Sequence, residues 1–116
     1  MNQPIKKIKV KPYPIRAAIL GGPKPVEVEI LKLVRAGFLA NVKEMFHVGH
    51  HFETVFQLPV SHYEIRGPVR VRKTYDRLVP GTATRERIVE FSFEARTDEQ
   101  TQHISQFLRT IRQEEF

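Results

Sequence analysis

The sequence contains no cysteine and no long apolar run. Without cysteine the chain forms neither disulfides nor cysteine-ligated zinc sites, and thiolate chemistry is excluded. Its first residues, M-N-Q-P-I-K-K, lack the apolar stretch of a secretion signal, and no segment is apolar for long enough to span a membrane. We therefore expect a cytoplasmic protein with no membrane span.

Motifs of the common enzyme classes are also missing. The chain has no nucleophile elbow, no P-loop and no G-x-G-x-x-G. His47, His50 and His51 are close in sequence, which raises the question of a metal site. However, His50 and His51 would point to opposite faces of a strand, and no helical His–Glu spacing accompanies them. We expect no enzyme activity, no catalytic residue, no metal site and no cofactor.

The charge is the unusual feature of the composition. Nineteen Lys and Arg against thirteen Asp and Glu give a net charge of +6. Such a balance favours an anionic partner, such as a nucleic acid, a nucleotide, a phospholipid surface or an acidic protein patch. A basic surface without any ligand is equally compatible with the charge alone.

Apolar periodicity predicts a series of short strands within one domain, residues 1–116. We predict strands at 15–20, from Val26 to a hinge at 32–37 that ends in Gly37, and then at 38–42, 51–58, 63–73 and 87–93. Gly67-Pro68 predicts a bulge or bend on an edge strand, and residues 74–85 a polar loop. These strands make up a predicted barrel over residues 15–93.

The period changes at the C-terminus, where residues 97–114 are predicted to form a helix. Thr97 and Gln100 have the spacing of a capping box. An apolar stripe follows at helical spacing, formed by Ile104, Phe107, Leu108 and Ile111. Six short strands and one amphipathic helix predict a mainly β fold, a six-stranded antiparallel β-barrel capped by a C-terminal α-helix.

A basic arm, residues 1–12, precedes the first predicted strand. Its segment I-K-K-I-K-V-K carries Lys6, Lys7, Lys9 and Lys11. Pro12 and Pro14 then disfavour a helix and indicate an extended entry into the barrel.

This order of elements resembles the PilZ domain family over nearly the whole chain. The features that carry the resemblance are the basic arm, the glycine hinge after the second strand, a V-G before the fourth strand, a long strand with V-R-V-R, a closing strand ending E-F-S-F and a C-terminal helix. The resemblance implies a six-stranded barrel that binds cyclic di-GMP through two motifs. One is an R-x-x-x-R arm and the other is D-x-S-x-x-G at the hinge.

Carried over to this chain, the two motifs match only in part. Gly37 occupies the position of the hinge glycine, but Lys32 replaces the aspartate and Val34 replaces the serine. In the arm, Lys7 and Lys11 replace the two arginines. Lysine does not reproduce the bidentate and stacking contacts of arginine. The resemblance therefore implies an atypical PilZ domain whose nucleotide site has degenerated.

Two interpretations of the basic residues remain open. The first is a phosphate-attracting, nucleotide-binding patch formed by Lys6, Lys7, Lys11, Lys32 and Arg35 with Gly37. The second is that these are solvated charges, as runs of charge usually are. A further basic row, Arg66, Arg70 and Arg72, shares one strand face and is either an exposed face opposite the core or a surface for a partner protein.

Three classes of function follow. The preferred one is a non-catalytic PilZ-type signalling adaptor that acts by protein contact in a second-messenger, motility or pilus pathway, with cyclic di-GMP binding lost or weakened. The second is a cyclic di-GMP receptor that uses lysine in place of arginine. The third is a small basic barrel that binds nucleic acid. We set the third lowest because Phe52, Phe56, Phe91 and Phe93 mostly share the core parity and leave no stacking platform.

Overall fold

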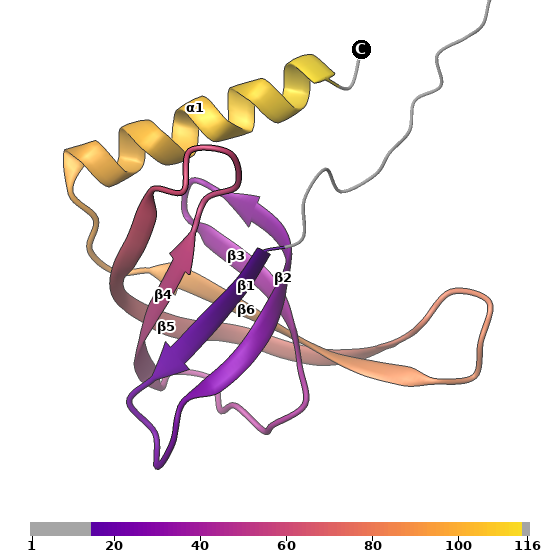
Figure 1. Cartoon of the computed structure of the whole chain (residues 1–116). Coiled ribbons are helices and arrows are strands. Elements are labelled where there is room, and N and C mark those ends of the chain that lie inside the picture. Colours follow the sequence, from indigo (N-terminus) through magenta and orange to yellow (C-terminus); the bar gives the residue numbers. More distant parts are fainter. Residues whose placement is uncertain (1–14, 115–116) are drawn as a thin grey trace, which may run out of the picture.

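The computed structural model describes residues 15–114 as six strands and one helix (Figure 1). In chain order they are β1 (Ile15–Leu20), β2 (Val26–Val34), β3 (Gly37–Val42), β4 (His51–Gln57), β5 (Glu64–Leu78), β6 (Arg85–Phe93) and α1 (Asp98–Glu114). The strands close into an antiparallel barrel in the order β1-β2-β3-β6-β5-β4. The predicted fold class, a six-stranded antiparallel barrel with a C-terminal helix, is confirmed.

Alternate residues of each strand fill the barrel, because successive side chains of a strand point to opposite faces. Phenylalanines dominate the centre: the ring of Phe38 lies 5.2 Å from that of Phe91 and 5.7 Å from that of Phe56, between centroids. Among the described residues Thr54 is the one buried polar side chain, and its hydroxyl donates to the Ala18 carbonyl oxygen at 3.2 Å. In β4, β5 and β6, the alternate residues that we expected to face the core therefore do face it.

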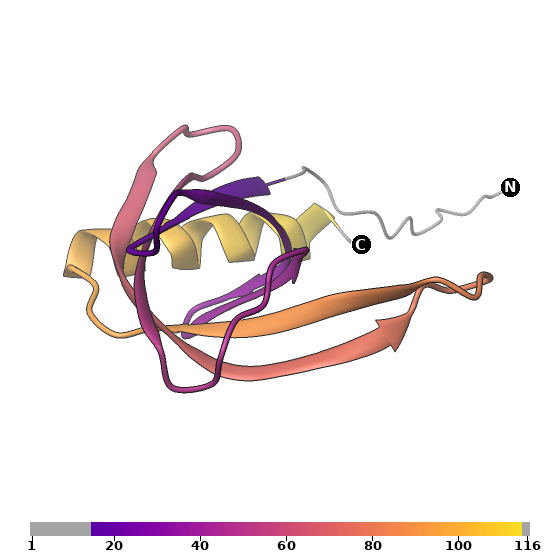
Figure 2. The ribbon, with the colours of Figure 1, turned by 90° about the horizontal axis from the view of Figure 1, so that it is seen from below.

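Helix α1 lies across one end of the barrel (Figures 1 and 2). Ile104 is completely buried, and Phe107 and Leu108 pack against the core. The helix begins with the predicted capping box, in which the Gln100 amide donates to Thr97 Oγ1 at 3.1 Å and the Thr97 amide to Gln100 Oε1 at 3.4 Å. Ile104, Phe107 and Leu108 of the apolar stripe thus cover the chain's own barrel. Of the described residues, no helix is long and apolar enough to cross a membrane.

The loop between β4 and β5 contacts α1 through one aromatic pair. The ring of Tyr63 stacks on that of His103, with centroids 3.7 Å apart and planes inclined by 5°. Loss of solvent around the phenol, and then the charge of Glu99, raise the pKa of Tyr63 above its ordinary value. The phenol is therefore protonated at neutral pH, as an ordinary tyrosine is.

The hinge after β2 is shorter than predicted. We expected it to span residues 32–37, but β2 continues to Val34 and β3 begins at Gly37, so only Arg35 and Ala36 form the turn. The reason is a bulge: Ile30 pairs with Ala40 and Lys32 with Leu39, which leaves Leu31 as the extra residue. Beyond the bulge, Leu33 again points into the core.

The polar loop predicted at residues 74–85 is wrong for half of its length. β5 runs to Leu78 and β6 begins at Arg85, so the connection covers only residues 79–84. The two strands continue past the end of the barrel as a two-stranded ribbon, which Figure 2 shows projecting away from it. We call residues 73–87 the ribbon. Its β5 residues are exposed on both faces, so they lack the apolar alternation by which strands are predicted.

The bulge predicted at Gly67-Pro68 on an edge strand is also misplaced. Gly67 and Pro68 pair regularly with Thr54 and Glu53 of β4, and the bulge of β5 lies instead between Val71 and Lys73. Proline is tolerated because β6 ends at Phe93, beside Val69, and only the amide of Glu94 reaches the Pro68 carbonyl, at 2.9 Å.

Candidate binding groove at the hinge

A groove with a volume of about 380 Å³ lies on the outer face of the barrel, beside the turn that joins β2 to β3. Its lining includes Lys32, Val34, Gly37, Leu39, Arg72, Glu90 and Ser92. The groove therefore lies where the family resemblance implies the nucleotide site.

Strand register positions the charged groups of this groove. Lys32 pairs with Leu39, Leu39 with Glu90, and Glu90 with Lys73, so these residues form one row across β2, β3, β6 and β5. Paired residues of neighbouring strands lie on the same face. The outward bulge at Arg72 adds a guanidinium to the same groove. Two cations that line the groove, Lys32 and Arg72, thus lie with one carboxylate, and Lys73 lies next to that carboxylate in the row.

The fold requires a glycine at position 37, independently of any ligand. A Cβ at this position would clash with the carbonyl oxygen of Phe91 and would lie 2.8 Å from the Cα of Ser92. The close approach is fixed by strand pairing, since the Phe93 amide donates to the Ala36 carbonyl at 2.8 Å. The glycine lets β3 lie against β6 at the end of the sheet.

The nucleotide-binding residues expected from the sequence are only partly brought together. Lys32 and Gly37 share the groove, whereas Arg35 lies exposed in the turn and does not line it. Lys6, Lys7 and Lys11 lie outside the described residues. The described chain enters at Ile15, which pairs with Ile30 in the half of β2 that leads to the hinge.

The three arginines of the predicted partner surface do not all lie in the same environment. Arg66 pairs with Glu64 at 3.1 Å, and Arg70 lies between His51 and Ser92 on the neighbouring strands. Arg72 leaves this row at the bulge and lines the groove with Lys32. All three side chains are exposed.

Sequence reasoning missed the groove contributions of Glu90, Ser92 and, in this role, Arg72. Each comes from β5 or β6, far along the chain from the hinge motif. Only the pairing of β3 with β6 brings them to it, and that pairing leaves no local pattern. The one sequence feature that pointed to Arg72 was the V-R-V-R segment. A bulge in this segment turns the side chain of Arg72 toward the groove.

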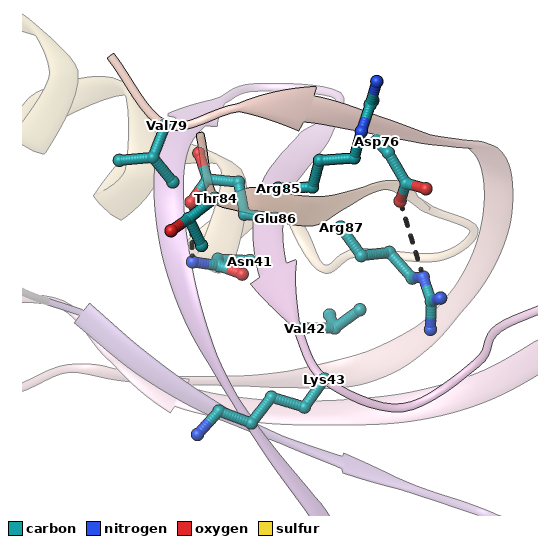
Figure 3. A pocket seen from close by; sticks show the side chains of 9 residues that line it. All are labelled: Asn41, Val42, Lys43, Asp76, Val79, Thr84, Arg85, Glu86 and Arg87. Carbon is teal, nitrogen blue, oxygen red and sulfur yellow. Dashed lines mark hydrogen bonds and ion pairs between the residues drawn. The ribbon is translucent and has the colours of Figure 1, made fainter. Parts of the chain in front are cut away.

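A second hollow, with a volume of about 500 Å³, lies where the ribbon leaves the barrel (Figure 3). Val79 and Thr84 line the side opposite Lys43. Its two carboxylates already have partners: Asp76 lies 3.7 Å from the Arg87 guanidinium, and Glu86 lies 2.6 Å from that of Arg77. Within the described residues Lys43 and Arg85 form no ion pair, so the hollow carries a positive excess.

The clustered histidines do not converge on one point. The rings of His47 and His50 lie 5.5 Å apart, while His51 turns to Glu94, with 2.8 Å between Nδ1 and the carboxylate. In the described part of the chain no three metal-ligating side chains come together.

Comparison with known proteins identifies the fold through structure alone. No family model matches the chain, and no curated protein matches it in sequence. Two solved structures resemble it. The PilZ domain of YcgR from Escherichia coli with c-di-GMP superimposes with a TM-score of 0.73 at 11% identity, over 87% of this chain and 83% of that one.

The second structure is the Bacillus subtilis inhibitor of motility MotI/DgrA, with a TM-score of 0.63 at 15% identity. The match covers 94% of this chain but only 53% of that one, so the chain spans about half of its length. At these identities the likeness concerns the fold. Together with the barrel order and the helix that caps it, the two structures show that the chain has the PilZ-like fold.

Proposed function

We propose that the chain is a non-catalytic PilZ-type signalling adaptor that acts through protein contacts, in the cytoplasm, with cyclic di-GMP binding lost or weakened. The observation that carries this proposal is that an apolar side chain, Val34, forms part of the groove wall. This side chain is 41% exposed and lines the groove at the position where the resemblance implies a serine. It offers the nucleotide neither a hydrogen-bond donor nor an acceptor.

The charge at Lys32 supports the same proposal. The aspartate implied at this position accepts hydrogen bonds from the guanine edge, whereas an ammonium group only donates them. The neighbouring carboxylate, Glu90, repels phosphate from the same groove. A base-reading site has thus become a weakly cationic one, which leaves the barrel surface for protein partners.

A second candidate, a cyclic di-GMP receptor, is favoured by one specific observation. Arg72 shares the groove with Lys32, and its guanidinium is capable of the bidentate phosphate contact that lysine lacks. Lys7 and Lys11 precede Ile15 in the sequence and lie outside the described residues. We do not propose nucleic-acid binding, because among the described residues Tyr75 is the one exposed aromatic.

Calorimetric titration of cyclic di-GMP into the protein tests the choice. The adaptor proposal expects no heat for the unaltered chain at physiological salt. A variant with four substitutions, Lys32→Asp, Val34→Ser, Lys7→Arg and Lys11→Arg, restores the two implied motifs. This variant is expected to bind cyclic di-GMP. Lys24→Asp, a charge reversal in the exposed β1–β2 turn, serves as the control.

Each result decides between the two candidates. Low-micromolar binding by the unaltered chain that is lost in Arg72→Ala or Lys7→Ala would establish the receptor and end the adaptor proposal in this form. Absence of binding in the restored variant would mean that the hinge residues are not what limits the site, which contradicts the argument from Val34.

A further inference from the structure

The β5 side of the ribbon has an open strand edge. β4 pairs with β5 only as far as Arg70, which lies opposite His51. The last contacts on this side are those of Val71, whose amide donates to the His50 carbonyl at 2.9 Å and whose carbonyl accepts from the Gly49 amide at 2.8 Å. Beyond this point, no strand of the described chain lies beside β5 on that side.

One hydrogen bond at the ribbon tip fixes which amides point outward. The Val79 amide donates to the carbonyl of Thr84, just before β6, at 2.8 Å, so residue 79 faces the ribbon's own partner strand. The amides of a strand alternate in direction. Thr74, Asp76 and Leu78 therefore direct their N–H and C=O groups to the open side, and Tyr75 and Arg77 direct theirs to β6.

Side chains give this edge a distinct chemistry on each face. Lys73, Tyr75 and Arg77 share one face of the ribbon, on which they pair with Glu90, Ile88 and Glu86. Thr74, Asp76 and Leu78 lie on the other face. The ribbon holds four Lys and Arg against two Asp and Glu, and its apolar side chains are exposed, 38% for Tyr75 and 54% for Leu78.

We propose that the open β5 edge of the ribbon binds an extended acidic segment of a partner protein as an added antiparallel or parallel strand. Three outward amides and three outward carbonyls supply the main-chain contacts, as in other sheets that accept a strand at an edge. Acidic side chains at alternate positions of that segment lie next to Lys73 and Arg77. Apolar side chains between them lie on the face of Thr74 and Leu78. This inference does not depend on the nucleotide groove.

A second copy of the chain fits the edge less well. In the self-paired register centred on residue 76, Asp76 lies opposite Asp76 of the other copy, and in the register centred on residue 77 Arg77 faces Arg77. Like charges directly opposite one another destabilise a strand pair. The positive excess of two ribbons adds to this repulsion, so charge favours an acidic partner over self-association.

The test uses the full chain and a short fluorescent peptide of alternating glutamate and valine. Fluorescence anisotropy is expected to show binding that weakens as salt rises. A peptide of the same composition with all glutamates in one block is the control, and it is expected to bind at least about tenfold more weakly. Lys73→Ala is expected to weaken binding, while Lys24→Ala, an exposed lysine in the β1–β2 turn, leaves it unchanged.

Hydrogen exchange and backbone methylation separate strand addition from charge attraction. The bound peptide is expected to slow exchange at the amides of Thr74, Asp76 and Leu78, whereas those of Tyr75 and Arg77 are already bonded to β6. If the segment is antiparallel, the amides of its valines face the ribbon, so N-methylation of the valines is expected to abolish binding and N-methylation of the glutamates to leave it; a parallel segment reverses these two results. Asp76→Pro blocks the edge without removing a main-chain hydrogen bond to β6, and Asp76→Asn controls for the loss of its ion pair with Arg87.

Three outcomes would overturn the proposal. They are no anisotropy change up to about 1 mM peptide, equal binding of the alternating and block peptides, and binding without protection of the outward amides. The first would mean that the charges of the ribbon protect its edge from pairing, which is a common use of charged edge residues. A shift of the chain to a dimer at the same concentrations, with its own amides at 74, 76 and 78 protected, would replace the acidic partner by a second copy.

Discussion

Strands β5 and β6 pass through two different environments, and the contrast explains much of this molecule. Inside the barrel both strands have neighbours on each side, and Ile65, Val69 and Val71 of β5 are completely buried or nearly so. In the ribbon β5 pairs only with β6, and residues 73–78 are all exposed. Backbone pairing therefore continues where apolar burial has ended. The barrel holds the fold together, and the ribbon presents main-chain groups.

The largest expected difference between the two regions comes from removing one aromatic side chain from each. Phe91 is buried between Phe38 and Phe46, so Phe91→Ala is expected to lower the free energy of unfolding by about 3–5 kcal/mol. Tyr75→Ala, in the exposed ribbon, is expected to change it by about 0.5 kcal/mol or less. Urea unfolding measures both, and similar losses would contradict the division into core and ribbon.

The next effect concerns the end of the barrel at the hinge. Gly37→Ala places a methyl group against the Phe91 carbonyl and is expected to cost about 3 kcal/mol, because backbone atoms do not move aside easily. Gly81→Ala, at the ribbon tip, is the comparison: nothing lies near its Cβ, and only its φ of 78° opposes the change. A larger drop in melting temperature in Gly81→Ala than in Gly37→Ala would refute the close-approach argument.

The helix is expected to contribute less per residue than the barrel centre. Phe107 packs against the core but stays partly exposed, so Phe107→Ala is expected to cost about 2–3 kcal/mol. Gln106→Ala, on an exposed turn of the same helix, controls for helix propensity. No loss of stability in Phe107→Ala would place the apolar stripe on a partner instead of on the barrel.

The smallest effect is expected from the ion pair within the ribbon. Arg77 Nε lies 2.6 Å from the Glu86 carboxylate, with the arginine half exposed. A double-mutant cycle of Arg77→Ala and Glu86→Ala is expected to give a coupling of about 0.5 kcal/mol, reduced at high salt. A coupling well above about 1 kcal/mol would show that the ribbon is held more rigidly than its exposure implies.

The same contrast explains which parts of the fold were predictable from sequence. Strands with one buried face alternate visibly, which is why β1 and the core parities of β4 and β6 were predicted, and the capping box marked the helix start at Thr97. The ribbon part of β5 is exposed on both faces, so residues 74–78 looked like a loop. The bulges at Leu31 and Arg72 were missed because a bulge depends on the partner strand.

The groove was predictable only in its local part. Lys32, Val34 and Gly37 lie on one short segment and were found together by resemblance to a motif. Glu90 and Arg72 reach the groove through pairing of strands that are distant in sequence, which periodicity does not encode. Whether the groove binds cyclic di-GMP, and whether Arg66 and Arg70 contact a partner, stay predictions.

The barrel order also has a consequence for how the chain reaches this structure. Pairs β1–β2, β2–β3, β4–β5 and β5–β6 join neighbours in sequence through short connections, so they form with little loss of loop entropy. Pairs β1–β4 and β3–β6 connect distant segments, and loop closure precedes any gain from them. We expect the hairpins of neighbouring strands to form first and the seam between β1 and β4 to close late. Because the ribbon belongs to an early hairpin, its open edge is exposed before the barrel is complete, and that is when its charges matter most for keeping chains apart.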